Sequence, residues 1–100
     1  MYILYLGLND KNTKKQEIST ADARKIVSEY CAKVLGFATI SEASGVYTHE
    51  NGDVVEETTL QVKVSGVNEE EIRTAANWLK DRFNQESIGL LTIPFEIDLI

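Results

Sequence analysis

The sequence predicts an α+β fold in which two helices cover one face of a four-stranded antiparallel sheet. Three observations support this prediction. A strand-like apolar run (residues 2–8) precedes an amphipathic helix (20–35), two strands flank an Asn-Gly turn, and a second amphipathic helix (69–84) precedes a last apolar strand (90–100). This order is typical of a ferredoxin-like βαββαβ sandwich with strand order 4-1-3-2. We expect one domain spanning residues 1–100. Because such sandwiches host many unrelated functions, the order does not predict an activity.

The two predicted helices have clear starts, ends and apolar stripes. Ser19 or Thr20 can cap the first helix, and Gly36 stops it. Asn68 caps the second helix, whose first turn holds Glu69, Glu70 and Glu71, where carboxylates complement the helix dipole. The expected core residues recur at three- and four-residue steps: Ala23, Ile26, Val27, Tyr30, Cys31 and Val34 in the first helix, and Ile72, Ala75, Ala76, Leu79 and Phe83 in the second.

The strands are predicted from alternating apolar residues and from turn signals. Asn51-Gly52 favours a two-residue type I′ hairpin, and Ser41, Ser44 and Gly45 suggest a bulge in the preceding strand. Pro94 cannot donate a ladder hydrogen bond, which favours an edge position for the last strand. We expect the helix-covered face of the sheet to carry Leu4, Leu6, Leu8, Leu60, Val62, Val64, Leu91, Ile93, Phe95, Ile97 and Leu99.

Composition narrows the function classes. The chain carries a net charge of −6, and eight acids face only Lys63 between residues 36 and 71, which argues against a nucleic-acid-binding module. No apolar stretch approaches the roughly 20 residues of a membrane span, and the N-terminus lacks a basic leader, so we expect a cytoplasmic protein. Cys31 is the only cysteine; it excludes an intrachain disulfide and is interpreted as a buried, inert thiol.

Motifs of established chemistry are missing from the sequence. There is no HExxH, P-loop, CxxC or GxGxxG pattern, so neither a metal nor a cofactor is predicted. His49, the only histidine, lies beside the hairpin turn and is interpreted as a surface residue, with a catalytic base as the alternative. Nothing in these patterns identifies an enzyme.

The face of the sheet that the helices leave open is the better candidate site. Aromatic rings among polar groups on such a face suit a dimer contact, a ligand floor or plain surface, and these alternatives remain open. Two unprotected edge strands add to the expectation of a homodimer, through the open face or through an edge. The residues expected on the open face are Tyr5, Glu57, Thr59, Gln61, Thr92 and Glu96, joined by Tyr47 if no bulge changes the register of the second strand.

Two segments of the C-terminal half resemble a family of small bacterial and phage proteins of unknown function. The strand after the turn, NGDVVEETTLQVKV (51–64), is similar to a G-x-[IV]-x-x-E-x-[ST] pattern, and WLKDRFNQESI (78–88) to a K-x-R-F-x-Q-E-S-[IV] helix end. The resemblance supports the fold and points to Glu57, Arg82, Gln85 and Glu86. We interpret Gln85 and Glu86 as a structural lock of the helix-to-strand connection, or as part of a site, and expect Glu57 to pair with Arg82.

The sequence leads to two functional hypotheses. The main one is a non-catalytic cytoplasmic accessory protein, phage- or mobile-element-borne, that acts by protein–protein binding. Its acidic surface would mimic nucleic acid toward a basic partner. The alternative is a small-molecule-binding domain or enzyme with its site on the open sheet face, where Glu57 serves as general acid or base. The residues of the expected acidic surface are Glu50, Asp53, Glu56, Glu57, Glu69, Glu70 and Glu71.

Overall fold

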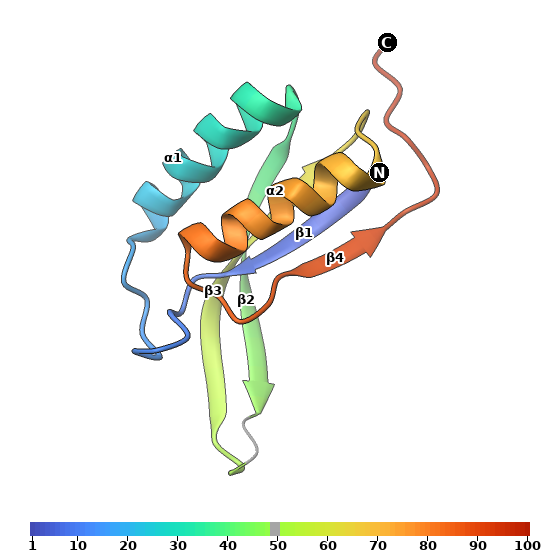
Figure 1. The fold of residues 1–100 in the computed structure, drawn as a ribbon. Helices are drawn as coiled ribbons and strands as arrows, with labels where there is room; N and C mark the ends of the chain where they lie inside the picture. Colours follow the sequence, from blue (N-terminus) through green and yellow to red (C-terminus); the bar gives the residue numbers. More distant parts are fainter. Residues whose placement is uncertain (49–50) are drawn as a thin grey trace.

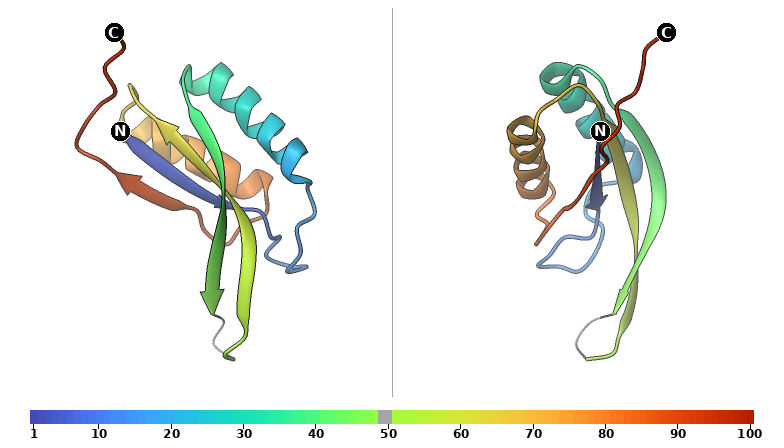
Figure 2. Two further views of the ribbon diagram at one scale, coloured as in Figure 1. Left: turned by 180° about the vertical axis from the view of Figure 1, so that it is seen from behind. Right: turned by 90° about the vertical axis from the view of Figure 1, so that its right-hand side faces the viewer.

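The computed structural model describes residues 1–48 and 51–100. Its sheet has the order β2-β3-β1-β4 with antiparallel neighbours, which is the predicted order 4-1-3-2 counted from the other edge. Both helices lie on one face of the sheet (Figures 1 and 2). The ferredoxin-like prediction is therefore confirmed. In chain order the elements are β1 (Tyr2–Gly7), α1 (Thr20–Tyr30), a π-helical turn η1 (Cys31–Leu35), β2 (Thr39–Thr48), β3 (Val54–Val64), α2 (Glu69–Arg82) and β4 (Gly89–Thr92).

The helix boundaries follow from their caps. The Ser19 hydroxyl accepts a hydrogen bond from the Asp22 backbone N–H at 3.1 Å, and α1 with η1 ends at Gly36, which has a φ of 80°. Asn68 and Glu71 form a reciprocal capping box at the start of α2. Among the described residues, no helix is long and apolar enough to cross a membrane.

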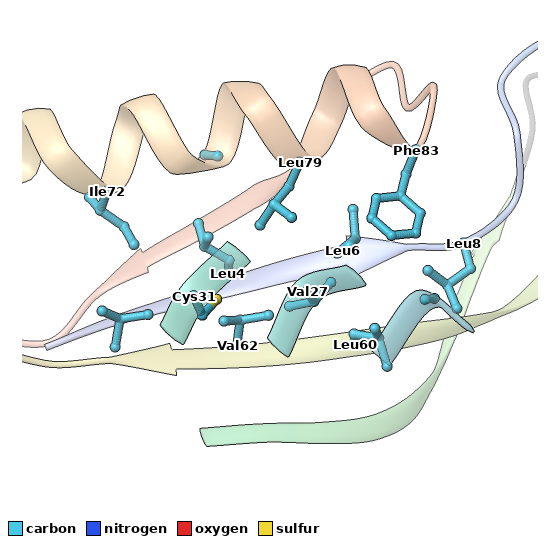
Figure 3. Packing of buried hydrophobic residues seen from close by; sticks show 13 residues of the cluster. Leu4, Leu6, Leu8, Val27, Cys31, Leu60, Val62, Ile72, Leu79 and Phe83 are labelled. Atoms are coloured by element: carbon cyan, nitrogen blue, oxygen red, sulfur yellow. The ribbon is translucent and has the colours of Figure 1, made fainter. Parts of the chain in front are cut away.

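The hydrophobic core lies between the helices and the sheet, as Figure 3 shows. Leu4 and Leu6 of β1 are completely buried, and so are Leu60 and Val62 opposite them on β3. Cys31 packs in this core, where burial raises the pKa of its thiol to about 11. A thiol that stays protonated and covered is a poor nucleophile, which agrees with its interpretation as inert.

The end of the first helix departs from the expected stripe. Val34, expected in the core, is exposed, whereas Leu35 packs against the core. The wider π-helical turn η1 explains the change, because it moves the apolar stripe by one residue.

The strand before the hairpin turn differs from the prediction. The pairing of β2 with β3 runs without interruption from Thr39↔Lys63 to Thr48↔Val54, so the expected bulge does not form. The predicted Asn51-Gly52 turn follows residues 49 and 50, which lie outside the described residues. The serines and the glycine of β2 therefore have another role than bending the strand.

The last strand is shorter than predicted, and its alternation is opposite to the predicted one. Leu90 pairs with Leu4 and packs on the core, whereas Leu91 pairs with Ile3 and lies on the open face. Thr92 pairs with Tyr2 and so lies on the helix-covered side, not on the open face. After Ile93, whose N–H still bonds the Met1 carbonyl at 2.8 Å, the chain leaves the sheet. The residues beyond it that were expected in the core are exposed: Phe95, Ile97 and Leu99.

Glu96 also lies away from the open face on which it was expected. It belongs to the segment after β4, and its carboxylate accepts hydrogen bonds from the Met1 ammonium group and the Ser65 hydroxyl. These contacts attach the C-terminal segment to the beginning of the chain and to the end of β3.

Candidate functional site

The strand register gathers the candidate residues at one part of the open face. Tyr5 of β1 pairs with Gln61 on one side and with Gly89 on the other, and Gly7 pairs with Thr59. Because side chains alternate along a strand, these residues share the face opposite the core. The uninterrupted β2–β3 pairing also brings Glu57 and Tyr47 to this face, through the pairs Gly45↔Glu57 and Tyr47↔Val55.

The Glu57 carboxylate extends from β3 across the end of β1. Its Oε2 accepts a hydrogen bond from the Asn9 backbone N–H at 3.1 Å, just beyond the last ladder bond from Leu8 N–H to the Thr58 carbonyl. Gly7 makes this position possible, because a Cβ built on Gly7 would stand 2.4 Å from Glu57 Oε1. The space that the missing side chain of Gly7 leaves therefore accommodates a half-buried carboxylate.

Two further glycines on this face also accept close neighbours. A Cβ on Gly89 would lie 3.2 Å from Cβ of Tyr5, and one on Gly45 would lie 2.8 Å from the Thr59 hydroxyl. Both glycines sit in strands, where glycine is otherwise unfavourable. They let larger side chains of neighbouring strands lie low over the sheet, which keeps the space above it open.

The result is an open hollow of about 340 Å³ at this end of the face. Its floor comes from the sheet, and its walls come from the β1–α1 loop and from the connection between α2 and β4. The volume is at the small end of the range for ligand sites. The residues that line it are Tyr5, Gly7, Asn9, Asp10, Lys11, Lys14, Tyr47, Glu57, Thr59, Gln85, Glu86, Ser87 and Gly89.

Gln61 lies on the open face but outside the lining of the hollow. Its side-chain oxygen accepts a hydrogen bond from the Ser41 hydroxyl at 3.2 Å. This bond links β3 to β2, which gives Ser41 a role between strands and leaves Gln61 as a support of the sheet beside the site.

The hollow carries charges of both signs. Desolvation raises the pKa of Tyr47, and the nearby carboxylates of Glu57 and Glu86 raise it further, so the phenol stays neutral at physiological pH. Asp10 has a lowered pKa, because its carboxylate accepts hydrogen bonds from the Asn84 side chain and from two backbone N–H groups of its own loop. The site thus combines aromatic rings, fixed carboxylates and the ammonium groups of two lysines.

The residues of the motif at the end of α2 do not all lie at the hollow. Gln85 is buried, and its amide donates to the carbonyls of Asn9 and Phe83. Glu86 is exposed and lines the hollow. Arg82 lies elsewhere: its guanidinium carbon stands 5.9 Å from the centre of the Phe83 ring, and it borders a groove beside α1.

The predicted pair of Glu57 with Arg82 does not form within the subunit. Glu57 lies on the open face, whereas Arg82 belongs to a helix on the opposite face, and the sheet separates them. Over the described part of the chain, the ion pairs are Met1–Glu96, Arg24–Glu42 and Arg73–Glu69.

The acidic residues do not form one continuous surface. Asp53 and Glu56 lie near the tip of the β2–β3 hairpin, while Glu69, Glu70 and Glu71 begin α2 at the opposite end of the molecule (Figure 1). The separation follows from the fold, because the hairpin extends away from the end of the sheet at which α2 starts. The expected acidic surface is therefore divided into two distant groups.

The glutamates of α2 have structural roles that account for their positions. Glu71 is occupied in the capping box, and Glu69 pairs with Arg73 at 3.0 Å. Glu70 is exposed in the same first turn, where its charge complements the helix dipole, and its carbonyl accepts a hydrogen bond from the Thr74 hydroxyl at 2.9 Å. This turn is a helix start, and its carboxylates do not continue the acidic group of the hairpin.

Two of the predicted residues, His49 and Glu50, lie outside the described residues. Across residues 1–48 and 51–100, no group of three or more histidines, cysteines and carboxylates could hold a metal ion.

Sequence reasoning finds the tyrosines and Glu57 but misses the loop side of the hollow. Asn9, Lys11 and Lys14 belong to a polar loop for which the sequence predicts no role. Gly7 belongs to the predicted first strand, and a glycine inside a strand signals close approach of another group. That signal is present in the sequence; the loop contacts depend on tertiary structure.

Among the comparisons with known proteins, the one with solved structures supports the fold. No family model and no curated protein matches this chain, so the family resemblance noted above gains no support. Two solved structures are similar to it, a phage SAM lyase in complex with S-methyl-5′-thioadenosine and a phage SAM lyase in the apo state. The TM-scores are 0.62 and 0.59 at 22% and 21% identity. Each alignment covers 89% of this chain, and 75% and 74% of the other. At this identity the likeness shows a shared fold.

These structures contradict the main functional hypothesis. Both similar structures are of an enzyme, and one of them holds a small molecule, whereas the sequence analysis predicts a non-catalytic accessory protein that binds other proteins. They favour the alternative, a small-molecule site or enzyme. The misleading observation is the absence of a catalytic motif, because a hollow lined by residues from several strands and loops leaves no compact sequence signature.

Proposed function

We propose that this protein binds an adenosyl sulfonium compound in the hollow of the open face and cleaves it as a SAM lyase does. The observation that carries the proposal is the combination of a held carboxylate with aromatic rings in one hollow. Glu57 is fixed by the Asn9 N–H at 3.1 Å, and Tyr5 and Tyr47 line the same space. The similar fold of the phage SAM lyase supports the choice of ligand.

The charges of the hollow fit those of S-adenosylmethionine (SAM). SAM carries a positive sulfonium, a positive ammonium and a negative carboxylate. Aromatic faces and carboxylates attract cations in a partly desolvated site, and the site offers both Glu57 and the tyrosine rings. Lys11 and Lys14 on the loop wall carry the opposite charge, which suits the substrate carboxylate.

The reaction needs little from the protein beyond orientation and charge. When the bond between sulfur and the amino-acid chain breaks, its electron pair stays on sulfur and the neutral thioether S-methyl-5′-thioadenosine leaves. The carbon that loses sulfur gains a new bond in its place. That bond comes either from the substrate's own carboxylate oxygen or, in an elimination, from the electron pair of a neighbouring C–H bond. Neither route needs a further reactant.

Glu57 would act on both routes. Its carboxylate holds the cationic substrate, and in an elimination it accepts the proton that the neighbouring carbon loses. The phenol of Tyr47, which stays protonated, can donate a hydrogen bond in the site.

The test is incubation of the purified protein with SAM, followed by chromatography for S-methyl-5′-thioadenosine. We expect release of this product by the unmodified protein and a loss of at least about 100-fold in Glu57→Gln. Glu56→Gln is the matched control, because Glu56 is the adjacent, exposed glutamate on the other face of β3. Absence of both product and SAM binding by calorimetry would rule out the proposal.

Location and assembly are part of the same proposal. A single, buried cysteine suits the cytoplasm, where thiols stay reduced, and we place the protein there.

We also propose that it forms a homodimer, because the hollow is open on one side and β2 and β4 are edge strands of the sheet. Light scattering at micromolar concentration checks the assembly, and a mass near the 11.2 kDa of one chain would exclude the dimer.

A further inference from the structure

Among the described residues, Gln85 is the buried polar side chain, and it is part of the lining of the hollow. It is 9% exposed. Its Nε2 donates to the Asn9 carbonyl at 2.6 Å and to the Phe83 carbonyl at 3.2 Å. Burying an amide is unfavourable unless its polar atoms are bonded, so these two bonds fix the side chain in one orientation.

The backbone of Gln85 is fixed as well, by the end of α2. Its N–H bonds the Lys80 carbonyl at 2.9 Å, and the Asn84 N–H bonds the Asp81 carbonyl at 3.2 Å. Asn84 has a φ of 49°, the left-handed conformation that ends a helix in a Schellman motif. The helix end therefore presents the Gln85 amide to the β1–α1 loop from a rigid support.

Asn9 connects this support to Glu57. Its carbonyl accepts the hydrogen bond from Gln85, and its N–H donates to Glu57 Oε2 at 3.1 Å. The two groups lie on either side of the Asn9 Cα, so rotation of Asn9 would break both bonds. The order of contacts runs from α2 through Gln85 and Asn9 to the carboxylate in the hollow.

A purely structural role for Gln85 explains less. The same loop is already attached to the helix end by Asn84, whose side chain donates to Asp10 at 3.0 Å and whose carbonyl accepts from the Lys11 N–H at 2.9 Å. Those bonds tie down the loop without contacting Asn9. Gln85 is the member of the junction that bonds the residue holding Glu57.

We propose that Gln85 is a positioning residue that sets the orientation of Glu57 through Asn9. The inference rests on the proposed function, because Glu57 contacts the substrate only there. The hydrogen bonds from Gln85 through Asn9 to Glu57 do not depend on a substrate. Such a residue affects turnover more than affinity, because a small misplacement of a reacting group costs up to about 100-fold in rate.

The experiment compares Gln85→Met, which keeps the side-chain size and removes the donor, with Asn84→Gly. The control keeps the left-handed conformation and removes only the side-chain bond to Asp10. In ¹⁵N-resolved NMR spectra we expect Gln85→Met to shift the Asn9 amide proton upfield, as Glu57→Gln does, and to add no further shift in the double variant. We expect Asn84→Gly to leave the chemical shift of the Asn9 amide proton unchanged.

In the SAM assay we expect Gln85→Met to lower kcat by up to about 100-fold with little change in KM, and Asn84→Gly to leave both unchanged. An unmoved Asn9 amide in Gln85→Met, or an equal shift in Asn84→Gly, would overturn the inference. If the chain proves inactive toward SAM, the proposed function fails while the amide shift still decides the role of Gln85. If Gln85→Met does not fold, Gln85→Asn replaces it, because its shorter side chain loses the bond to Asn9.

Discussion

Neighbouring residues of β1 belong to two very different environments. Leu4 and Leu6 are completely buried under the helices, while Tyr5 and Gly7 border the hollow on the other face. The first face is filled by branched apolar side chains that interlock with α1 and α2. The second carries glycines at three places where a side chain of the next strand crosses the sheet.

The difference shows how one sheet can bury a core on one face and keep a hollow on the other. Burial of large apolar groups on the helix side supplies the folding free energy. The open side buries less side-chain area, because glycine has no side chain to pack and weakens a strand. That loss creates space over the sheet and leaves room for a carboxylate held by the backbone amide of Asn9.

The largest expected effect tests the helix side. Leu6→Ala leaves a cavity in the core and should lower the free energy of unfolding by about 3 kcal/mol, whereas Tyr5→Ala should cost about 1 kcal/mol because Tyr5 is partly exposed. Urea denaturation measures both. Equal losses would show that the two faces contribute alike to stability.

The next effect tests the open side. In Gly7→Ala, the new methyl group would occupy the place of the Glu57 carboxylate. We expect product release from SAM to fall by about 100-fold, with Glu57 displaced from Asn9. Gly36→Ala is the control for a glycine change away from the site, since a Cβ there meets no neighbour although its positive φ makes it slightly less stable. Full activity in Gly7→Ala would mean that Glu57 does not need its present position.

A smaller effect separates the ring of Tyr47 from its hydroxyl. Tyr47→Leu removes the aromatic face and should weaken SAM binding by about 1 kcal/mol, the usual size of a cation–π contact. Tyr47→Phe keeps the face and should bind almost as well. Calorimetric titration gives both affinities, and a greater loss in the phenylalanine variant would assign the binding to the phenol.

The smallest expected effect concerns Glu96 in the segment after β4, and it is a change in stability at acid pH. Hydrogen bonds, first from the Ser65 hydroxyl, lower the pKa of Glu96 to about 2 from 4.5. Since the folded pKa lies below the unfolded one, the stabilisation is complete above about pH 4.5 and disappears as the pH falls toward 2. Thermal melts of Glu96→Gln should therefore depend less on pH in this window than those of the unmodified protein. Identical profiles would show that Glu96 has no such role.

The fold could be predicted from the sequence because periodicity and caps act locally. Ser19, Gly36 and Asn68 set helix ends as predicted, since each acts on its own few backbone groups. The last strand is predicted too long because its apolar alternation continues to Leu99, although pairing with β1 stops at Thr92. Of the site, the open-face residues follow from alternation. The contact from Gln85 to Asn9 spans 76 positions and follows from no local pattern.

The hairpin gives the two tyrosines different mechanical supports. β3 pairs with β1 from Thr59 onward, so the part that carries Tyr47 is a two-stranded ribbon that extends beyond the sheet (Figure 2). Two strands alone are only marginally stable, and they bend and twist more easily than a sheet. Tyr5 lies on a central strand that is paired on both sides, whereas Tyr47 lies on the ribbon, which bends more easily. Bending of this ribbon would move Tyr47 relative to Tyr5 and so change the width of the hollow, with the core unchanged.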